Sequence, residues 1–518
     1  MLPTPSGRNV GAASGEGAAG PAPWALASLA VSMLLSSLGT SIANVALPTL
    51  STAFDAPFRE VQWVVLAYLL AVTTLIVGVG RLGDLVGRRR LLLTGISIFT
   101  GASILCGLAP TLGLLIAFRA AQGLGAAAMM ALAMAMVGEA VAKERAGRAM
   151  GMLGTMSAIG TALGPSLGGA LIAGAGWRAI FLVNVPLGLL ALALAQRGLP
   201  AETDAPRAAP AGFDVAGTLL LVATLAAYAL AMTVGRGRLD GFNLALLVAA
   251  FVGAGLFGVV EKRSASPLIR LTVLGDGALS SGLATSALVS TVIMTTMVVG
   301  PFYLARTLGL DAARVGLVLS VGPLVAALTA VPAGRLVDRL GASPTSIAGL
   351  LGMAAGALML AMLPERLGTF AYVGPIVVVT GGYAFFQTGN NTAVMSGIGT
   401  GERGVVSGML NLSRNLGLVT GASAMGAVFA FATASTDLAT ARPAAVASGM
   451  RSTFAVAAAL LVGSLVLTLR SYAAMSRSRR PFLRVSPPGS PILEPACVAS
   501  ADSSRRPNAV RASSHEGR

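Results

Sequence analysis

Charged residues are scarce in this sequence. Only 11% of its 518 residues are Asp, Glu, Lys or Arg, whereas 55% are hydrophobic. A soluble protein carries roughly 25% charged residues, because its surface must face water. The deficit, together with a mean hydropathy of +0.80, excludes a soluble enzyme and indicates an exterior that faces lipid.

Histidine and cysteine are almost absent. The single histidine is His515, near the C-terminus, and the two cysteines are Cys106, in an apolar stretch, and Cys497, in the tail. These residues cannot supply a zinc site or a histidine-based catalytic system, and they indicate no disulfide framework. We therefore expect no metal site, no cofactor and no enzymatic activity.

Fourteen apolar stretches are long enough to cross a bilayer as helices. They cover residues 24–47, 61–79, 91–109, 112–137, 149–173, 179–195, 215–234, 244–260, 279–304, 315–331, 346–363, 370–395, 405–431 and 454–469. The predicted fold is an all-α integral membrane protein with two six-helix halves and two inserted central helices.

The predicted domains follow the polar segments between these stretches. We expect residues 1–23 to form a disordered cytoplasmic arm and residues 471–518 a disordered basic cytoplasmic tail, because neither has an apolar period. The first half covers residues 24–197 and is followed by a cytoplasmic linker, 198–212. The inserted helices and their linker cover residues 213–276, and the second half covers 277–470.

The net charge of +16 reflects membrane topology rather than nucleic-acid binding. The basic residues gather in alternate connections, such as Arg88-Arg89-Arg90, and in the tail. Connections of this kind stay in the cytoplasm. We expect a multi-pass protein of the cell inner membrane with both termini in the cytoplasm, which requires an even number of spans.

An eight-residue pattern occurs twice. Gly80–Gly87 follows the second apolar stretch and Gly334–Gly341 follows the tenth, with Gly, Arg, Leu, Asp and Gly in the same register. Duplicated halves that rock around a midplane site are a transporter design. We expect loops in which glycines permit a tight turn and Asp84 pairs with an arginine to lock one conformation. The predicted gate residues are Gly80, Arg81, Asp84, Gly87, Arg88, Gly334, Arg335 and Asp338; the alternative is a topology signal made by the basic residues.

Arginines within apolar stretches mark a second group of candidates. Arg119 lies inside the fourth predicted helix, and an arginine at mid-membrane costs roughly 2.5–3.5 kcal/mol on insertion scales, so it indicates function. Snorkelling from a helix end is the alternative. The candidates for proton coupling or for a cavity are Arg119, Gln122, Glu139 and Arg414.

A cluster of glycines and one proline lies in the fifth predicted helix. Its members are Gly160, Gly164, Pro165, Gly168 and Gly169. Proline removes a backbone hydrogen bond and bends a helix, and glycines offer a flat face to a neighbouring helix.

These three motifs resemble those of the major facilitator superfamily. Asn44–Pro48, Gln62-Trp63 to Tyr68, and Trp177-Arg178 to Pro186 also resemble segments of its fourteen-helix drug:proton antiporters. The resemblance implies a central cavity between the halves and export of drug-like or amphiphilic small molecules, driven by protons. It also implies that Arg119 assists proton transfer and that the glycine–proline cluster is the antiporter motif. We expect a monomer whose partners are the substrate, protons and lipid.

One position departs from that family. Its first helix usually carries an aspartate shortly before the Asn-Val-Ala-Leu-Pro run, and Gly39 stands there in this chain. A carboxylate is the usual proton carrier, so export of an endogenous metabolite with atypical or no proton coupling is the alternative function. A membrane-embedded enzyme or a sensor is disfavoured, because the sequence lacks an intramembrane carboxylate or histidine cluster and a soluble signalling domain.

Neutral polar residues complete the predicted substrate cavity. They are Asn44, Gln62, Gln387, Asn390, Asn391 and Asn411. Hydrogen bonds between helices are the alternative role for these amides.

Overall fold

Every regular element in the described part of the chain is helical. The computed structural model describes residues 23–140, 143–199, 214–233, 241–264, 277–362, 367–396, 403–434 and 441–478. Fourteen of the helices in these ranges are long and apolar enough to cross a membrane, which confirms the predicted fold class. In lipid, a helix satisfies its backbone hydrogen bonds within its own segment.

The helices follow the order of the predicted spans. The first half contains α1 (Pro23–Ala53), α2 (Phe58–Val61), α3 (Trp63–Val86), α4 (Arg88–Leu108), α5 (Leu112–Ala140), α6 (Lys143–Ala175), α7 (Ala179–Leu182) and α8 (Asn184–Gly198). The inserted pair is α9 (Val215–Thr233) and α10 (Gly241–Arg263). The second half contains α11 (Gly277–Phe302), the π-helix η2 (Tyr303–Thr307), α12 (Ala312–Leu340), α13 (Ala342–Met362), α14 (Phe370–Ser396), α15 (Arg403–Thr420), the π-helix η4 (Gly421–Met425), α16 (Gly426–Ala432) and α17 (Pro443–Ser478).

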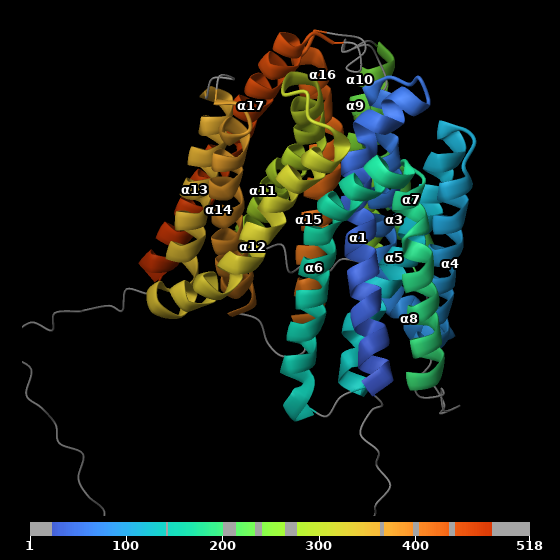
Figure 1. The fold of residues 1–518 in the computed structure, drawn as a ribbon. Helices are drawn as coiled ribbons and strands as arrows, with labels where there is room; N and C mark the ends of the chain where they lie inside the picture. The colour runs from blue at the N-terminus through green and yellow to red at the C-terminus, as the bar shows by residue number, and fades with distance from the viewer. Residues whose placement is uncertain are drawn as a thin grey trace, which may run out of the picture. The chain divides into compact units, whose positions relative to one another are not determined.

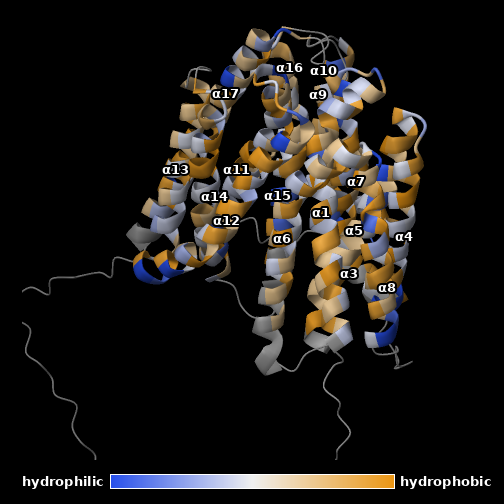
Figure 2. Cartoon of the chain, viewed as in Figure 1, coloured by the Kyte–Doolittle hydropathy of each residue, from blue (hydrophilic) through white to orange (hydrophobic). Residues whose placement is uncertain are grey.

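The two halves lie side by side in Figure 1, with the blue-to-teal helices beside the yellow-to-red ones. In the first half α1 packs on α6 and α3 on α5, while in the second α13 packs on α14 and α11 on α15. Figure 2 shows apolar residues along the helices and hydrophilic residues at several helix ends, including those of α8 and α12. This distribution fits helices that present their sides to lipid and their ends to water.

Close glycine contacts occur at the same place in both halves. In the first half, a Cβ atom at Gly125 of α5 would lie 2.6 Å from the carbonyl oxygen of Gly95 of α4. In the second, a Cβ atom at Gly382 of α14 would lie 2.7 Å from the carbonyl oxygen of Gly349 of α13. Gly95 and Gly349 each stand eight residues beyond the last glycine of the repeated motif, so the sequence repeat continues as a repeated packing contact.

The repeated motif itself is helical, and the prediction that Asp84 and Asp338 sit in loops was wrong. α3 continues to Val86 and α12 to Leu340. Each helix stops only at the last glycine of the motif, where Gly87 has φ 108° and Gly341 has φ 90°. Glycine adopts these angles without a Cβ penalty, so it ends the helix, whereas the residues before it are compatible with helix.

Several predictions fall outside the described residues. They concern the arm up to residue 22, most of the linker at 200–213 and the tail from 479, so the expected disorder stays a prediction, as do the domain boundaries. Within the described ranges, the last span begins at Pro443, earlier than the expected residue 454.

Cysteine labelling tests the topology. In a variant with Cys106 and Cys497 replaced by serine, single cysteines at Trp24, Arg90 and Tyr472 should react with an impermeant maleimide from the cytoplasm. A cysteine at Leu108, at the other end of α4 from Arg90, should react only from outside. All four side chains are exposed. Labelling of Trp24 and Tyr472 from opposite sides would contradict an even number of spans.

Candidate functional site

Arg119 of α5 is the centre of a buried polar network. Its side chain has no exposed surface, although it carries a guanidinium. Nε donates to the carbonyl oxygen of Val64 at 2.9 Å, and Nη2 donates to the carbonyl oxygen of Gly39 at 3.1 Å. Nη1 donates to Oε1 of Gln122 at 2.6 Å. The arginine therefore connects α5 to α3 and α1, and its snorkelling to a helix end is excluded.

Aromatic rings cover the guanidinium. Its central carbon lies 4.2 Å from the ring centroid of Tyr68 and 5.9 Å from that of Phe181. A cation over an aromatic face is stabilised by about 2 kcal/mol or more when both are desolvated. The Tyr68 hydroxyl donates to the carbonyl oxygen of Ser36 at 2.8 Å, so the ring is fixed against α1.

Gln122 extends the network to a fourth helix. Its Nε2 donates to Oγ of Ser103 on α4 at 2.7 Å, while its Oε1 accepts from Arg119. The amide is fully buried and both of its ends are bonded. Gln122 therefore holds the guanidinium rather than lining an open space.

The described hydrogen-bond partners of Arg119 are all neutral acceptors. Gly39, which stands where an aspartate was expected from the family resemblance, contributes only its carbonyl oxygen. A Cβ atom there would lie 3.1 Å from the Tyr68 hydroxyl and 3.3 Å from the Phe99 ring. A side chain at this position would thus enter the same group of residues that surrounds the guanidinium.

The two halves touch through glycine at one end of the spans, called here the Phe58 end because it carries Phe58; the other is called the Arg88 end. A Cβ atom at Gly169 of α6 would be 2.9 Å from Cα of Gly316 on α12, and one at Gly316 would be equally close to Cα of Gly169. The Cβ atom at Gly169 would also overlap the carbonyl oxygen of Ala312, and the one at Gly316 would overlap the carbonyl oxygen of Pro165. Sequence reasoning selected Gly169 and Pro165 but missed Gly316.

Three phenylalanines add an apolar contact between the halves at the Phe58 end. The Phe58 ring centroid lies 4.9 Å from that of Phe302 and 6.1 Å from that of Phe429, both in edge-to-face geometry. All three side chains are buried. In Figure 1 the ribbons of α6 and α12 are close in the upper part and diverge toward the lower part. The described contacts thus close the Phe58 end.

The other glycines of the α6 cluster serve packing within the first half. Cβ atoms at Gly160, Gly164 and Gly168 would collide with Leu34, Ser41 and Ile42 of α1. Among the glycines of the cluster, Gly169 alone faces the second half. The cluster thus packs α6 against α1 and also brings α6 into contact with α12.

The residues predicted to line a substrate cavity fall into a buried group and a half-buried group. Asn44 and Gln62 are buried; the Gln62 amide donates to the carbonyl oxygen of Arg59, and a Cβ atom at Gly426 of the second half would lie 2.7 Å from its Oε1. Asn390 donates to the carbonyl oxygen of Gly282 at 3.2 Å, which supports the alternative role of a bond between helices. The half-buried residues are Gln387, Asn391, Asn411 and Arg414.

The gate motif is only partly described. Gly80 lies in α3, and the side chains of Arg81 and Asp84 lie outside the described residues. The side chain of Glu139, a candidate for proton coupling, also lies outside them. Arg88 is half-buried, while Arg335 and Asp338 are exposed on α12, after Gly334. The predicted locking contacts stay a prediction.

The repeated motif, Arg119 and the glycine contact between the halves all lie within one region that matches a known family. A model of the Major Facilitator Superfamily matches residues 29–422. The chain belongs to the major facilitator superfamily. It is therefore a multi-pass membrane transporter, and its family members carry small molecules rather than catalyse reactions.

Two relatives and one solved structure are similar to this chain. It is 34% identical over 397 residues to the multidrug resistance protein Stp of Mycobacterium tuberculosis, covering 76% of this chain and 73% of Stp. It is 29% identical over 402 residues to the riboflavin transporter RibZ of Clostridioides difficile, covering 78% and 87%. A bacterial homologue of the human lysosomal transporter Spinster has the same fold, with a TM-score of 0.65 at 16% identity over 89% of this chain and 99% of that one.

Arg119→Lys tests whether the geometry of the buried network matters beyond its charge. Lysine keeps the charge but donates from a single nitrogen, so it cannot reach acceptors on α1, α3 and α5 together. A hydrogen bond from a charged group contributes roughly 1.5–3 kcal/mol, so we expect transport to fall by about tenfold or more. Arg178→Lys is the control, because Arg178 is exposed and also stacks on a ring, 4.4 Å from Trp177. Full transport by Arg119→Lys would show that charge alone suffices.

Gly169→Val tests the contact between the halves. The added side chain would overlap α12, so the Phe58 end should no longer close and transport should be lost. Spin labels at the exposed residues Leu108 and Met362, one in each half, should move apart by several ångströms. Gly174→Val on the same helix is the control, because a Cβ atom at Gly174 would meet no atom within 4 Å. An unchanged distance in Gly169→Val would contradict the role assigned to this contact.

Proposed function

We propose that this chain exports drug-like or amphiphilic small molecules from the cytoplasm by alternating access, as a monomer in the inner membrane. The observation that carries the proposal is the close approach of Gly169 and Gly316, because a contact without side chains can form and separate as the halves rock. The multidrug-resistance name of Stp and the resemblance of the α6 cluster to the antiporter motif support export rather than uptake.

The proposed direction of transport depends on the orientation. The basic residues at the Arg88 end, including Arg88, Arg89 and Arg90, support a cytoplasmic location for this end, and we propose the same location for both chain termini. The Phe58 end then faces outward and is the end held closed by glycine and phenylalanine. Substrate would enter from the cytoplasm and leave after this end opens.

We propose further that the transporter prefers anionic or neutral substrates to cations. Arg119 is a desolvated cation whose described partners are neutral, and the predicted spans contain no acidic residue at their centres. A second cation at ~6 Å would be repelled by about 3 kcal/mol at an effective dielectric constant of ~20. An anionic substrate would instead be attracted to the same charge.

The first candidate function is drug export driven by proton antiport. The second candidate is export of an endogenous metabolite without proton coupling. The neutral network at Gly39 and the riboflavin transport named for RibZ favour the second candidate. Efflux from vesicles with and without a proton ionophore, combined with a drug-susceptibility panel in a pump-deficient host, separates the two. Drug resistance that depends on the proton gradient supports the first candidate; ionophore-insensitive efflux without resistance supports the second.

Gly39→Asp tests the charge preference. The carboxylate would lie next to Arg119 and neutralise it, so export of ethidium relative to an anionic fluorophore should rise by about tenfold or more, given the Coulombic cost above. Gly39→Asn is the matched control, because it adds nearly the same volume beside Tyr68 and Phe99 without charge. Strong ethidium export by the unmodified protein would contradict the preference, while leaving the export function intact.

A further inference from the structure

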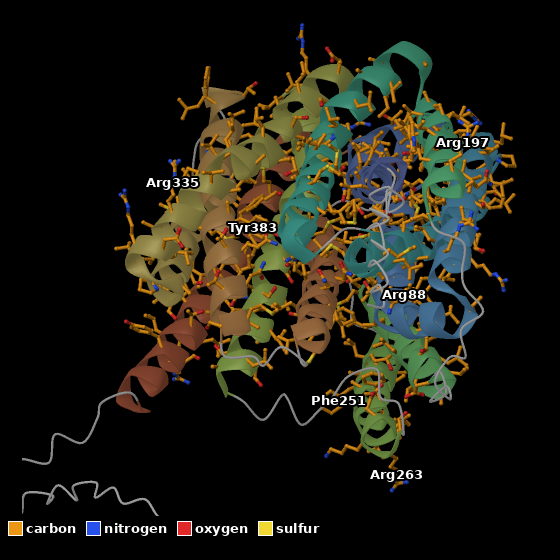
Figure 3. All side chains as sticks on the ribbon, turned by 90° about the horizontal axis from the view of Figure 1, so that it is seen from below. Arg88, Arg197, Phe251, Arg263, Arg335 and Tyr383 are labelled. Carbon is orange, nitrogen blue, oxygen red and sulfur yellow. The ribbon has the colours of Figure 1, made fainter. Side chains whose placement is uncertain are left out.

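The inserted helices α9 and α10 form one unit. A Cβ atom at Gly253 of α10 would collide with the hydroxyl of Thr224 of α9, so the two helices meet closely. Near the connection between them, Nδ2 of Asn243 donates to the carbonyl oxygen of Ala231 at 3.0 Å. Figure 3 shows Phe251 and Arg263 of α10 at the outer margin of the helices, and Phe251 is 84% exposed. The pair presents α10 to lipid and α9 to the protein.

α9 contacts both halves of the transporter. It packs against α3 of the first half and against η4 and α16 of the second. At mid-height the side chains of Leu221, Leu225 and Phe257 form an apolar cluster, called here the seam cluster. Leu70 of α3 and Leu416 of α15 both pack on it. The pair therefore covers the seam between the two halves where α3 lies beside α15 and η4.

The contacts of α9 with the two halves differ in chemistry. Nε1 of Trp63, at the start of α3, donates to Oγ1 of Thr233 at 3.1 Å, and Thr233 is buried. On the other side α9 lies against η4, a segment of small residues and one methionine. No hydrogen bond joins α9 to α11 through α17 among the described residues. A buried hydrogen bond is directional and leaves a desolvated donor if broken, whereas apolar contacts can be exchanged as surfaces slide.

We propose that the α9–α10 pair moves with the first half as one rigid body, and that α9 slides over η4 and α16 when the halves separate at the Phe58 end. The pair then seals the seam against lipid while the outward-facing state is open. Substrate leaves along the membrane normal and not sideways between α3 and α16. This inference rests on the alternating access proposed above and is independent of substrate identity.

Distances between spin labels test the motion. Labels at the exposed residues Leu244 of α10, Leu108 of α4 and Met362 of α13 all lie toward the Phe58 end and away from every proposed site. Electron–electron double resonance is measured in pairs, in the unmodified background and in Gly169→Val, which we expect to hold this end open. We expect the 108–362 and 244–362 distances to increase by several ångströms and the 244–108 distance to stay constant. A change in 244–108 with a constant 244–362 would assign the pair to the second half and overturn the proposal.

Cross-linking gives a second test that does not depend on Gly169→Val opening the transporter. In the background without Cys106 and Cys497, a cysteine at Leu225 is paired either with one at Leu70 or with one at Leu416. Bridging with a short membrane-permeant reagent should leave transport unchanged for 225–70 and abolish it for 225–416. Each double variant before cross-linking serves as its own control for folding and activity.

The outcomes separate this inference from the proposed function. Loss of transport in both bridged variants, or in 225–70 alone, would overturn the rigid attachment of α9 to α3. Retention in both would show that the seam does not move, again overturning the inference. Failure of the proposed function would appear elsewhere, as absence of efflux in the unbridged proteins with a constant 108–362 distance.

Discussion

The bilayer's lack of hydrogen-bonding partners is the constraint on which the rest of this structure depends. Backbone groups in lipid must be paired within the protein, which only helices and closed barrels achieve, and the long apolar stretches of this chain cross as helices. Lipid is as apolar as the side chains, so burial of apolar area does not drive these helices together. Close packing through small residues takes that role, as at Gly95 with Gly125 and at Gly349 with Gly382.

The same constraint explains the environment of Arg119. A guanidinium without water must direct its donors to other acceptors, and here two backbone carbonyls and one amide supply them. The Tyr68 ring covers the face that has no acceptors. The arginine thus holds α1, α3 and α5 together by polar bonds where apolar side chains could not. A rearrangement of these helices would have to break bonds to a desolvated charge, so the first half is suited to move as a unit.

Sequence patterns predicted the spans well and the partners of the site only in part. Hydropathy determines where a helix can cross, so the fourteen spans could be found. Gln122 follows Arg119 by three residues on one helix, so their contact could be expected from helix geometry. Val64, Gly39 and Tyr68 reach the guanidinium from other helices, and only tertiary packing shows this.

Gly316 has no motif around it, and its role follows from standing opposite Gly169. The helical state of Asp84 could not be predicted from the motif, because its glycines favour a turn, whereas only Gly87 ends α3.

The π-helix η4 has a mechanical consequence. A π-helical turn contains more residues than an α-helical one, and it is a local irregularity with weakened periodicity inside the thirteenth span. The thirteenth span is therefore not one continuous α-helix, because η4 separates α15 from α16. Gly421 at the start of η4 lets this segment approach α11 closely, since a Cβ atom there would lie 2.5 Å from the carbonyl oxygen of Thr291. A bend at η4 would let α16 tilt while α15 and η4 keep their contacts with α11. Part of the outward opening would then be a bend within a single membrane span rather than a displacement of the whole half.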